Sequence, residues 1–359
     1  MFCCSNCFAD VEIKAIIDGN KATGKCDFCG CHNGHVYEIG SDQTILELFD
    51  GLLDIYSPIS DLPMDFPREK TDLIKNILCN NWRLFNNLKP DAVYRLITAI
   101  CADRYRDQPE LFDSPVAIKQ YQDRDYLEEN SILKNNCWDD FVEGIKRKNR
   151  FHGDYINTDK LLVFLRCAVK SLRKGEVLYR SRICPDESGY TRKDMGPPPD
   201  NLAKGGRVNP TGISFLYLSD SKDTTFYEIR AGVYDFVTVG RFKLLKDIEV
   251  INLARIDSIS PFIGIDYGFD FTQYAINIEH LKMIAQEIAK PLRNDNALDY
   301  LPTQYISDYI RSKGYDGIEY ISTMSINGAN LAVFDPTLFK CTSTNVYDVK
   351  SISYSYTQL

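Results

Sequence analysis

Cysteine spacing near the start of the chain constrains its fold more than any other feature. Six cysteines lie within the first 31 residues: Cys3, Cys4, Cys7, Cys26, Cys29 and Cys31. Cys4 and Cys7 form one C-x2-C pair, and Cys26 and Cys29 form a second pair after 18 further residues. Each such turn presents two thiolates to one ion, so two turns complete a tetrahedron. The spacing predicts a zinc ribbon over residues 1–40, built of short β-like runs around structural zinc.

The ligand set of this ribbon is not unique, because four other residues of suitable chemistry lie nearby. These residues are Cys3, Cys31, His32 and His35. Three lysines and five acidic residues give the first 40 residues a net charge of −2, which argues against a ribbon that grips DNA or RNA. A site filled by four sulfur ligands leaves no open position for catalysis. We therefore expect a folding element or a docking module.

Composition places the chain among soluble globular proteins, with 44% hydrophobic and 26% charged residues in 359. The longest apolar runs, such as residues 161–165, are far shorter than a membrane span, and the N-terminus lacks the pattern of a secretory signal. These features predict a cytoplasmic protein with no membrane partner, whose cysteines bind metal or stay as inert thiols. The net charge of −8 makes nucleic acid an unfavoured partner.

The spacing of apolar residues in the rest of the chain changes near Gly175. Apolar residues at three- and four-residue spacing predict helices at 45–55, 71–78, 90–105 and 158–172. Beyond Gly175, strands are predicted at 176–183, 213–219, 236–242, 248–253, 317–322 and 330–334, and helices at 223–232 and 303–314. We expect a helical domain over 41–173, an α+β domain with a mostly antiparallel sheet over 174–345, and a C-terminal tail over 346–359.

Several motifs follow one another in this second half. They are LYRSR with Arg180, GGRVNPTGISFLYLS, TTFYEIR with Glu228, and DGIEYIS with Ser322 followed by NGANLAVFDP. The ordered set resembles the RES family of NAD⁺-degrading bacterial toxins, named for an Arg, a Glu and a Ser. The resemblance covers about half of the chain. It implies a fold similar to ADP-ribosyltransferases and cleavage of the nicotinamide–ribose bond of NAD⁺ by hydrolysis or phosphorolysis, while some members are protein ADP-ribosyltransferases.

The chemistry of the three catalytic candidates fits this reaction. Nicotinamide already carries a positive charge as a leaving group, so no general acid is required, and the transition state resembles an oxocarbenium ion. A carboxylate such as Glu228 can stabilise that charge and hold the ribose hydroxyls. The planar fork of Arg180 suits the pyrophosphate, and Ser322 could hydrogen-bond ribose or the nicotinamide amide.

Three further residues are candidate contacts to NAD⁺. Tyr217 could stack on the nicotinamide or ribose, Arg207 in the glycine-rich loop is a second phosphate candidate, and Tyr179 precedes Arg180. Each motif also has an ordinary structural explanation, such as a surface arginine, a helix ion pair or a buried strand. Only four histidines occur, and none of them lies in these motifs. The motifs therefore lack the histidine that a Ser–His–Asp or Cys–His hydrolase requires.

The helical middle resembles, more distantly, the HEPN-like segment ahead of some RES domains. Arg147 and His152 have the Arg-x4-His spacing of HEPN ribonuclease sites, although a solvated basic turn explains the same residues. The leading hypothesis is an NAD⁺-consuming toxin or phage-defence effector, with NAD as substrate. The alternatives are a protein ADP-ribosyltransferase and an HEPN-type ribonuclease or RNA-binding module. A toxic activity needs restraint, which implies an antitoxin or another protein regulator, and a homo-oligomer is compatible with the sequence.

Overall fold

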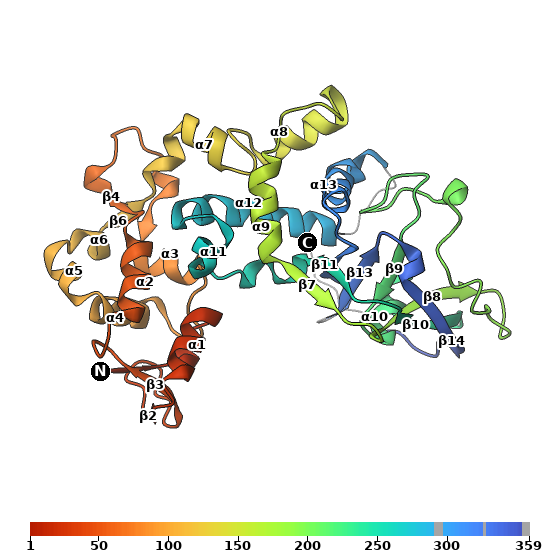
Figure 1. Cartoon of the computed structure of the whole chain (residues 1–359), viewed down its shortest axis with the longest axis horizontal. Helices are drawn as coiled ribbons and strands as arrows, with labels where there is room; N and C mark the ends of the chain where they lie inside the picture. The colour runs from red at the N-terminus through yellow and green to blue at the C-terminus, as the bar shows by residue number, and fades with distance from the viewer. Residues whose placement is uncertain (291–296, 326–327, 354–359) are drawn as a thin grey trace. The chain divides into compact units, whose positions relative to one another are not determined.

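The structure is a computed structural model that describes residues 1–290, 297–325 and 328–353. The chain divides into two compact units, which are described separately (Figure 1). The N-terminal unit comprises Met1–Asn135, Asn157–Val163 and Ser258–Glu279, and the C-terminal unit comprises Asn136–Ile156, Phe164–Asp257 and His280–Leu359. Within the described ranges, every helix is too short or too polar to cross a bilayer.

The cysteine segment folds as a three-stranded antiparallel sheet with a helix inserted between the two cysteine pairs. The strands are β1 (Phe2–Cys4), β2 (Thr23–Gly24) and β3 (Gly34–Glu38), in the order β1-β3-β2. The helix α1 (Val11–Gly19) was not predicted. Asp10 caps it by accepting hydrogen bonds from the N–H groups of Glu12 and Ile13. Ile13 and Ile17, four residues apart, bury its apolar face.

Helices make up most of the remaining N-terminal unit. They are α2 (Thr44–Leu53), α3 (Ile74–Asn80), α4 (Pro90–Ile100), α5 (Ala102–Asp107), α6 (Glu110–Asp113), α7 (Arg124–Asn130) and α11 (Gly264–Tyr267). A small antiparallel sheet joins β4 (Ser57–Pro58), β6 (Pro115–Ala117) and β5 (Asp72–Leu73). The helix predicted at 45–55 is confirmed, while the stretch at 71–78 begins as a strand. The stretch at 90–105 breaks at Cys101, whose ψ of 45° is not helical.

The C-terminal unit is built on an eight-stranded sheet in the order β14-β10-β8-β9-β13-β12-β11-β7 (Figure 1). Its strands are β7 (Val169–Leu172), β8 (Val177–Cys184), β9 (Leu216–Ser219), β10 (Phe236–Leu244), β11 (Ile248–Asn252), β12 (Gly317–Ile321), β13 (Ala329–Val333) and β14 (Phe339–Asp348). Neighbours are antiparallel except β11 and β12. The predicted α+β class with a mostly antiparallel sheet is confirmed.

The strands β7 and β14 were not predicted. The helix expected over 158–172 ends as α9 (Thr158–Cys167), because Val169 begins β7 and pairs with Ile251 of β11. Pairing with a distant strand overrides the local helical pattern there. The unpredicted β14 extends into the segment expected as a tail, of which residues 354–359 lie outside the described ranges.

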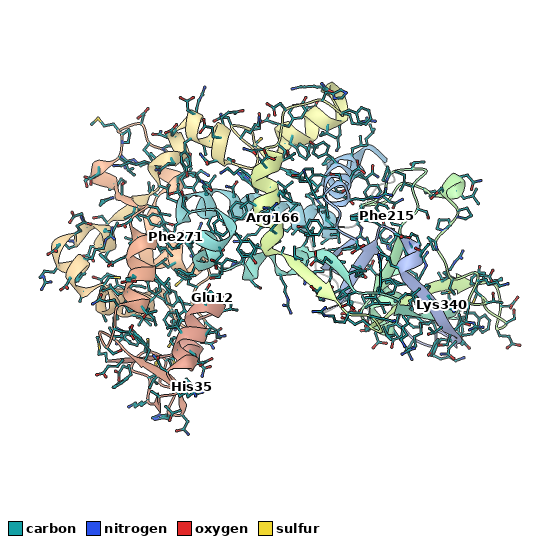
Figure 2. The ribbon with its side chains drawn as sticks, in the orientation of Figure 1. Glu12, His35, Arg166, Phe215, Phe271 and Lys340 are labelled. Atoms are coloured by element: carbon teal, nitrogen blue, oxygen red, sulfur yellow. The ribbon has the colours of Figure 1, made fainter. Side chains whose placement is uncertain are left out.

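Helices and an apolar core support the sheet. The helices are α8 (Trp138–Glu143), α10 (Lys222–Glu228), α13 (Leu301–Ser312) and the second half of α12 (Phe271–Ala289). Alternating strand residues such as Leu216 and Leu218 of β9, with Leu331 and Val333 of β13, form the buried core. Phe215, labelled in Figure 2, contacts Phe334 with ring centroids 4.9 Å apart. This core fixes the strands whose polar residues form the site below.

Candidate active site

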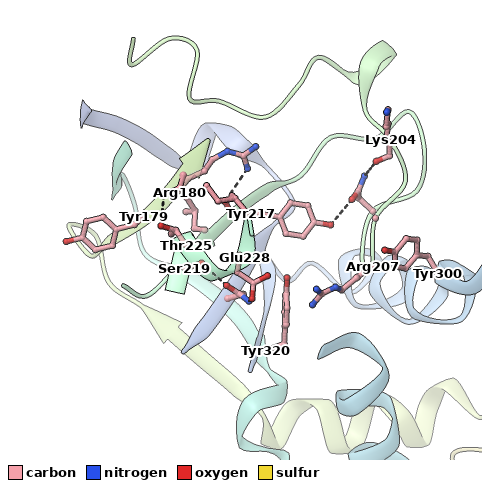
Figure 3. A pocket seen from close by; sticks show the side chains of 16 residues that line it. Tyr179, Arg180, Lys204, Arg207, Tyr217, Ser219, Thr225, Glu228, Tyr300 and Tyr320 are labelled. Atoms are coloured by element: carbon pink, nitrogen blue, oxygen red, sulfur yellow. Dashed lines mark hydrogen bonds between the residues drawn. The ribbon is translucent and has the colours of Figure 1, made fainter. Parts of the chain in front are cut away.

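The eight-stranded sheet is weakly joined between β8 and β9. Among the described residues one pair, Tyr179 with Ser219, connects these two strands. By contrast, β8 shares eight residue pairs with β10, and β9 shares four with β13. A cavity of about 400 Å³ lies at this seam and is lined by residues of both strands, of α10 and of the glycine-rich loop (Figure 3). The fold therefore places the cavity where four of the sequence motifs meet.

Glu228 contributes the carboxylate of the cavity from the last residue of α10. Its Oε1 accepts a hydrogen bond from Ser322 Oγ at 2.5 Å and another from Asn330 Nδ2 at 2.8 Å. Asn330 is itself fixed, because its Oδ1 accepts from Ser219 Oγ at 2.7 Å. Two donors thus hold one oxygen, while Oε2 makes no hydrogen bond to the described residues. The arrangement orients the carboxylate and leaves one oxygen for a ligand.

Ser322 lies behind Glu228. It follows β12 directly, is 3% exposed, and is not among the residues that line the cavity. Its hydroxyl accepts from the N–H groups of Met324 and Ser325 at 3.3 and 3.2 Å, and donates to Glu228. From its residue type, Ser322 was expected to contact ribose or nicotinamide directly. The observed contacts favour a positioning role, in which Ser322 acts through Glu228.

Arg180 brings a half-buried guanidinium group, whose Nε atom is fully buried, to the same cavity. Its Nη1 donates to the Tyr217 carbonyl oxygen at 3.2 Å, whereas its Nε is buried without a partner among the described residues. Burial, with a smaller contribution from Arg182, lowers the pKa of the guanidinium to about 10, so it stays protonated at neutral pH. A buried cation with an unused N–H is costly unless an anion accompanies it. The site is therefore suited to an anionic group.

Arg207 supplies a second guanidinium from the glycine-rich loop. Its Nη1 donates to the Ala289 carbonyl oxygen at 2.8 Å, and its Cζ lies 6.0 Å from the centre of the Tyr320 ring. In the view of Figure 3 the Tyr320 ring stands between Arg207 and Glu228. Positive and negative groups thus border one aromatic ring, which suits a ligand with a flat ring and charged parts.

Asn209 organises the loop around Tyr217. The Asn209 amide donates to the carbonyl oxygens of Lys204 and Ile213, both at 3.0 Å, and its Oδ1 accepts from the Tyr217 hydroxyl at 2.6 Å. Burial raises the pKa of Tyr217 far above its usual value. The Tyr217 hydroxyl is therefore a neutral structural donor, while its ring lines the cavity.

The structure brings most of the predicted site residues together. Arg180, Glu228, Arg207, Tyr217 and Tyr179 line one cavity, although Figure 3 shows the Tyr179 ring directed away from the others. Several lining residues were not predicted: Ser181, Lys204, Asn209, Ser219, Thr225, Tyr300, Tyr320 and Asn330. A signal existed for Tyr320 and Asn330, because both lie inside the quoted motifs around Ser322.

The cysteine cluster forms a candidate metal centre. Among the described residues the one group with metal-binding geometry is Cys4, Cys7, Cys26 and Cys29, whose sulfur atoms lie within 4.8 Å of one another. Cys4 and Cys29 are 3.4 Å apart at sulfur, as are Cys7 and Cys26. Sulfur atoms about 2.3 Å from a tetrahedral zinc would be about 3.8 Å apart, so the spacing fits. The other candidates, such as Cys31, which accepts from Asn6, lie outside this group.

Of the Arg-x4-His pair in the C-terminal unit, Arg147 lies in the π-helical segment Gly144–Lys148 and His152 in the exposed turn that follows it. Arg147 is exposed and lies 3.5 Å from Glu143 on the preceding helical turn. His152 is also exposed, and its N–H donates to Asn149 Oδ1 at 3.0 Å. These contacts match a solvated basic turn.

Comparison with known proteins places the chain in a family. No curated protein matches the chain. Among solved structures the chain is similar to a chain of the M. tuberculosis MbcT–MbcA toxin–antitoxin complex, with 13% identity over 53% of this chain and 93% of that chain, at a TM-score of 0.30. A family model described as the RES domain matches residues 177–356, half of the sequence. The chain therefore belongs to the RES domain family.

Proposed function

We propose that this chain is an NAD⁺-consuming enzyme that cleaves the nicotinamide–ribose bond and acts as a toxin or defence effector in the cytoplasm. The observation that carries the proposal is the cavity in which an oriented carboxylate, Glu228, faces the same space as the guanidinium groups of Arg180 and Arg207. The RES domain supports it, because the family resemblance implies NAD⁺ chemistry. Charges of both signs are what a zwitterionic dinucleotide requires.

Each group then has a role in the reaction. Arg180 and Arg207 hold the pyrophosphate, which supplies the anion that the half-buried Arg180 lacks. The bond between the anomeric carbon and the nicotinamide nitrogen breaks with its electron pair moving to nicotinamide, which leaves neutral. The ribose becomes an oxocarbenium ion, and the free oxygen of Glu228 stabilises it. Ser322 and Asn330 keep that carboxylate in place.

The nucleophile completes the reaction on the anomeric carbon. Water adds its oxygen and releases a proton, which gives ADP-ribose, whereas phosphate adds through an oxygen and gives a phosphorylated ADP-ribose. The test is to incubate the purified full-length chain with NAD⁺, with and without inorganic phosphate, and to identify the products. Release of nicotinamide in either buffer supports the proposal, and intact NAD⁺ in both contradicts it.

The runner-up activity is transfer of ADP-ribose to a protein by the same bond cleavage. Incubation of NAD⁺ labelled in its adenosine part with cell extract distinguishes the two activities. We expect the label in small molecules. Label on protein in amounts matching nicotinamide release would favour the transferase instead.

Arg180→Ala should weaken NAD⁺ binding, because it removes a charge-assisted contact to phosphate worth roughly 1.5–3 kcal/mol, or roughly ten- to 150-fold in affinity. Isothermal titration or the KM for NAD⁺ measures the change. Arg182→Ala is the matched control, since Arg182 lies over the Tyr190 ring, 4.9 Å from its centre, and does not line the cavity. Equal affinities of the two variants would refute the phosphate role of Arg180.

His152→Ala should leave NAD⁺ turnover nearly unchanged, because the side chain is exposed and does not line the candidate active-site cavity. The same variant tests the second alternative, a ribonuclease that uses Arg147 and His152. Degradation of RNA by the purified chain that disappears in His152→Ala would support that alternative. A hundredfold loss of NAD⁺ turnover in a folded variant would show that this turn contributes to the site.

We further infer that the four clustered thiolates hold a structural zinc ion and that a protein regulator, such as an antitoxin, restrains the activity. The cluster supports the first inference by its spacing and burial. The cost to a cell of losing NAD⁺ supports the second. Co-purification from a strain that expresses the neighbouring genes, followed by NAD⁺ turnover with and without the captured protein, tests for such a regulator.

A further inference from the structure

The N-terminal unit contains a pocket of about 300 Å³ that belongs to no site described above. Four aromatic residues line it: Tyr56, Trp82, Tyr121 and Tyr274. The charged residues of its lining are Glu69, Lys70, Asp72 and Glu279. We call it the aromatic pocket. Its volume is at the lower end of small-molecule sites, and such sites combine apolar walls with a few polar groups.

The walls of the aromatic pocket are fixed by their own contacts. Trp82 Nε1 donates to the Tyr56 hydroxyl at 2.7 Å, and the Trp82 and Tyr274 rings stack with centroids 5.1 Å apart. The Tyr274 hydroxyl donates to the Ile259 carbonyl oxygen at 2.8 Å. Because these contacts fix the side chains, the wall of the pocket is preformed, and a ligand would have to order few side chains on binding.

A cation of the chain itself already lies on one of these rings. The ammonium group of Lys70 is 5.3 Å from the centre of the Tyr121 ring. The Tyr121 hydroxyl is anchored by a 3.4 Å contact to the Ala275 carbonyl oxygen. Burial, and then the negative charge of Glu279, raise the pKa of Tyr121 to about 12, so the ring stays neutral. The Tyr121 face thus offers a cation–π surface.

The charges around the aromatic pocket favour a cation over an anion. Two exposed carboxylates, Glu69 and Asp72, line the pocket beside one ammonium group, that of Lys70, which leaves an excess of negative charge among these three neighbours. Among the described residues Lys70 forms no ion pair with either carboxylate. A phosphate would be repelled by the two carboxylates, whereas an organic cation gains from them and from the face of the Tyr121 ring.

The geometry points to a second ligand site in the aromatic pocket, one that takes an organic cation with an ammonium or guanidinium head and displaces Lys70 from the Tyr121 ring. This inference is independent of NAD⁺ cleavage. It concerns residues of the N-terminal unit alone and is tested by binding.

The experiment uses Trp82 as the reporter. The chain has two tryptophans, so Trp138→Phe in the full-length protein leaves Trp82 as the only one. Choline and methylguanidinium are titrated while the fluorescence of Trp82 is followed. The neutral probe is 3,3-dimethylbutan-1-ol, which has the shape of choline without its charge, and the anionic probe is AMP. We expect saturable responses to the two cations and weaker binding of the alcohol.

Two variants and one control then locate the bound cation. Lys70→Ala should tighten choline binding about two- to fivefold, because it removes a competing charge at an exposed position. Tyr121→Leu should weaken choline binding roughly two- to thirtyfold. Glu110→Gln removes an exposed carboxylate from α6 outside the pocket and should leave the affinity for choline unchanged. Equal binding of choline and the alcohol, no response to either cation, or binding of AMP that is lost in Lys70→Ala would overturn the assignment.

Discussion

Replacing Glu228 by Gln should lower NAD⁺ turnover about 10²- to 10³-fold, the range found when a group aimed at transition-state charge is removed. The hydrogen bonds around Glu228 make this substitution selective. A Gln oxygen can still accept from Ser322 and Asn330, so its amide nitrogen takes the position of Oε2. Shape is kept, and the negative charge toward the oxocarbenium ion is lost. Because that charge acts mainly in the transition state, KM for NAD⁺ should change little.

Measurement of kcat and KM for Glu228→Gln beside two other variants makes the test specific. Asp223→Asn removes an exposed carboxylate from the first turn of the same helix and should retain nearly full turnover. Ser322→Ala should give a loss smaller than that of Glu228→Gln, because the carboxylate remains and keeps its bond to Asn330. Wild-type turnover by a folded Glu228→Gln variant would refute the catalytic assignment.

Purified protein should contain about one zinc ion per chain, and Cys26→Ser should unfold the N-terminal ribbon. Structural zinc in small ribbons and fingers contributes apparent binding energies of about 10–16 kcal/mol to folding, and removing one thiolate forfeits much of this. In addition, the N–H groups of Phe28 and Cys29 donate to the Cys26 sulfur, so its loss also frees the turn. Elemental analysis gives the metal content, and hydrogen exchange of residues 1–40 reports the unfolding.

Cys31→Ser is the matched control for the metal. Cys31 lies two residues after the second pair, yet its sulfur belongs to no group with metal-binding geometry among the described residues. We expect this variant to keep its zinc and its exchange protection. Protein prepared without chelators and found free of zinc would contradict the assignment of the cluster.

The sequence predicted the elements whose pattern is local. Alternation of apolar residues over 236–242 and 248–253 marked β10 and β11, because each side chain there faces either the core or the other side of the sheet. The strand β7 could not be found in this way. Its residues continue a helical spacing, and only the pairing of Val169 with Ile251 makes them a strand. The helix α1 was not predicted either, because it is only nine residues long and lies between two cysteine pairs whose spacing is typical of turns.

Site residues could be predicted where they belong to a motif with recognisable chemistry. They could not be predicted where the register between two strands determines which side chains meet. Glu228 and Arg180 follow from the motifs, and both line the cavity. Asn330 reaches Glu228 only because it pairs with Ser219 across β9 and β13, a register that no single segment encodes. The same applies to Ser322, whose residue type suggested contact with substrate but whose burial places Glu228 between it and the cavity.

The seam between β8 and β9 couples ligand binding to the stability of the sheet. Among the described residues, β8 and β9 are joined by the strand pair Tyr179–Ser219 and by the bond from Arg180 Nη1 to the Tyr217 carbonyl oxygen, so few main-chain hydrogen bonds resist their separation. A molecule held by Arg180 on one strand and by the Tyr217 region on the other would bridge the two strands and act as an added cross-link. By mass action the melting temperature would then rise with the logarithm of ligand concentration above its Kd. In a cell, the resistance of this domain to unfolding would follow the supply of the molecule that it binds.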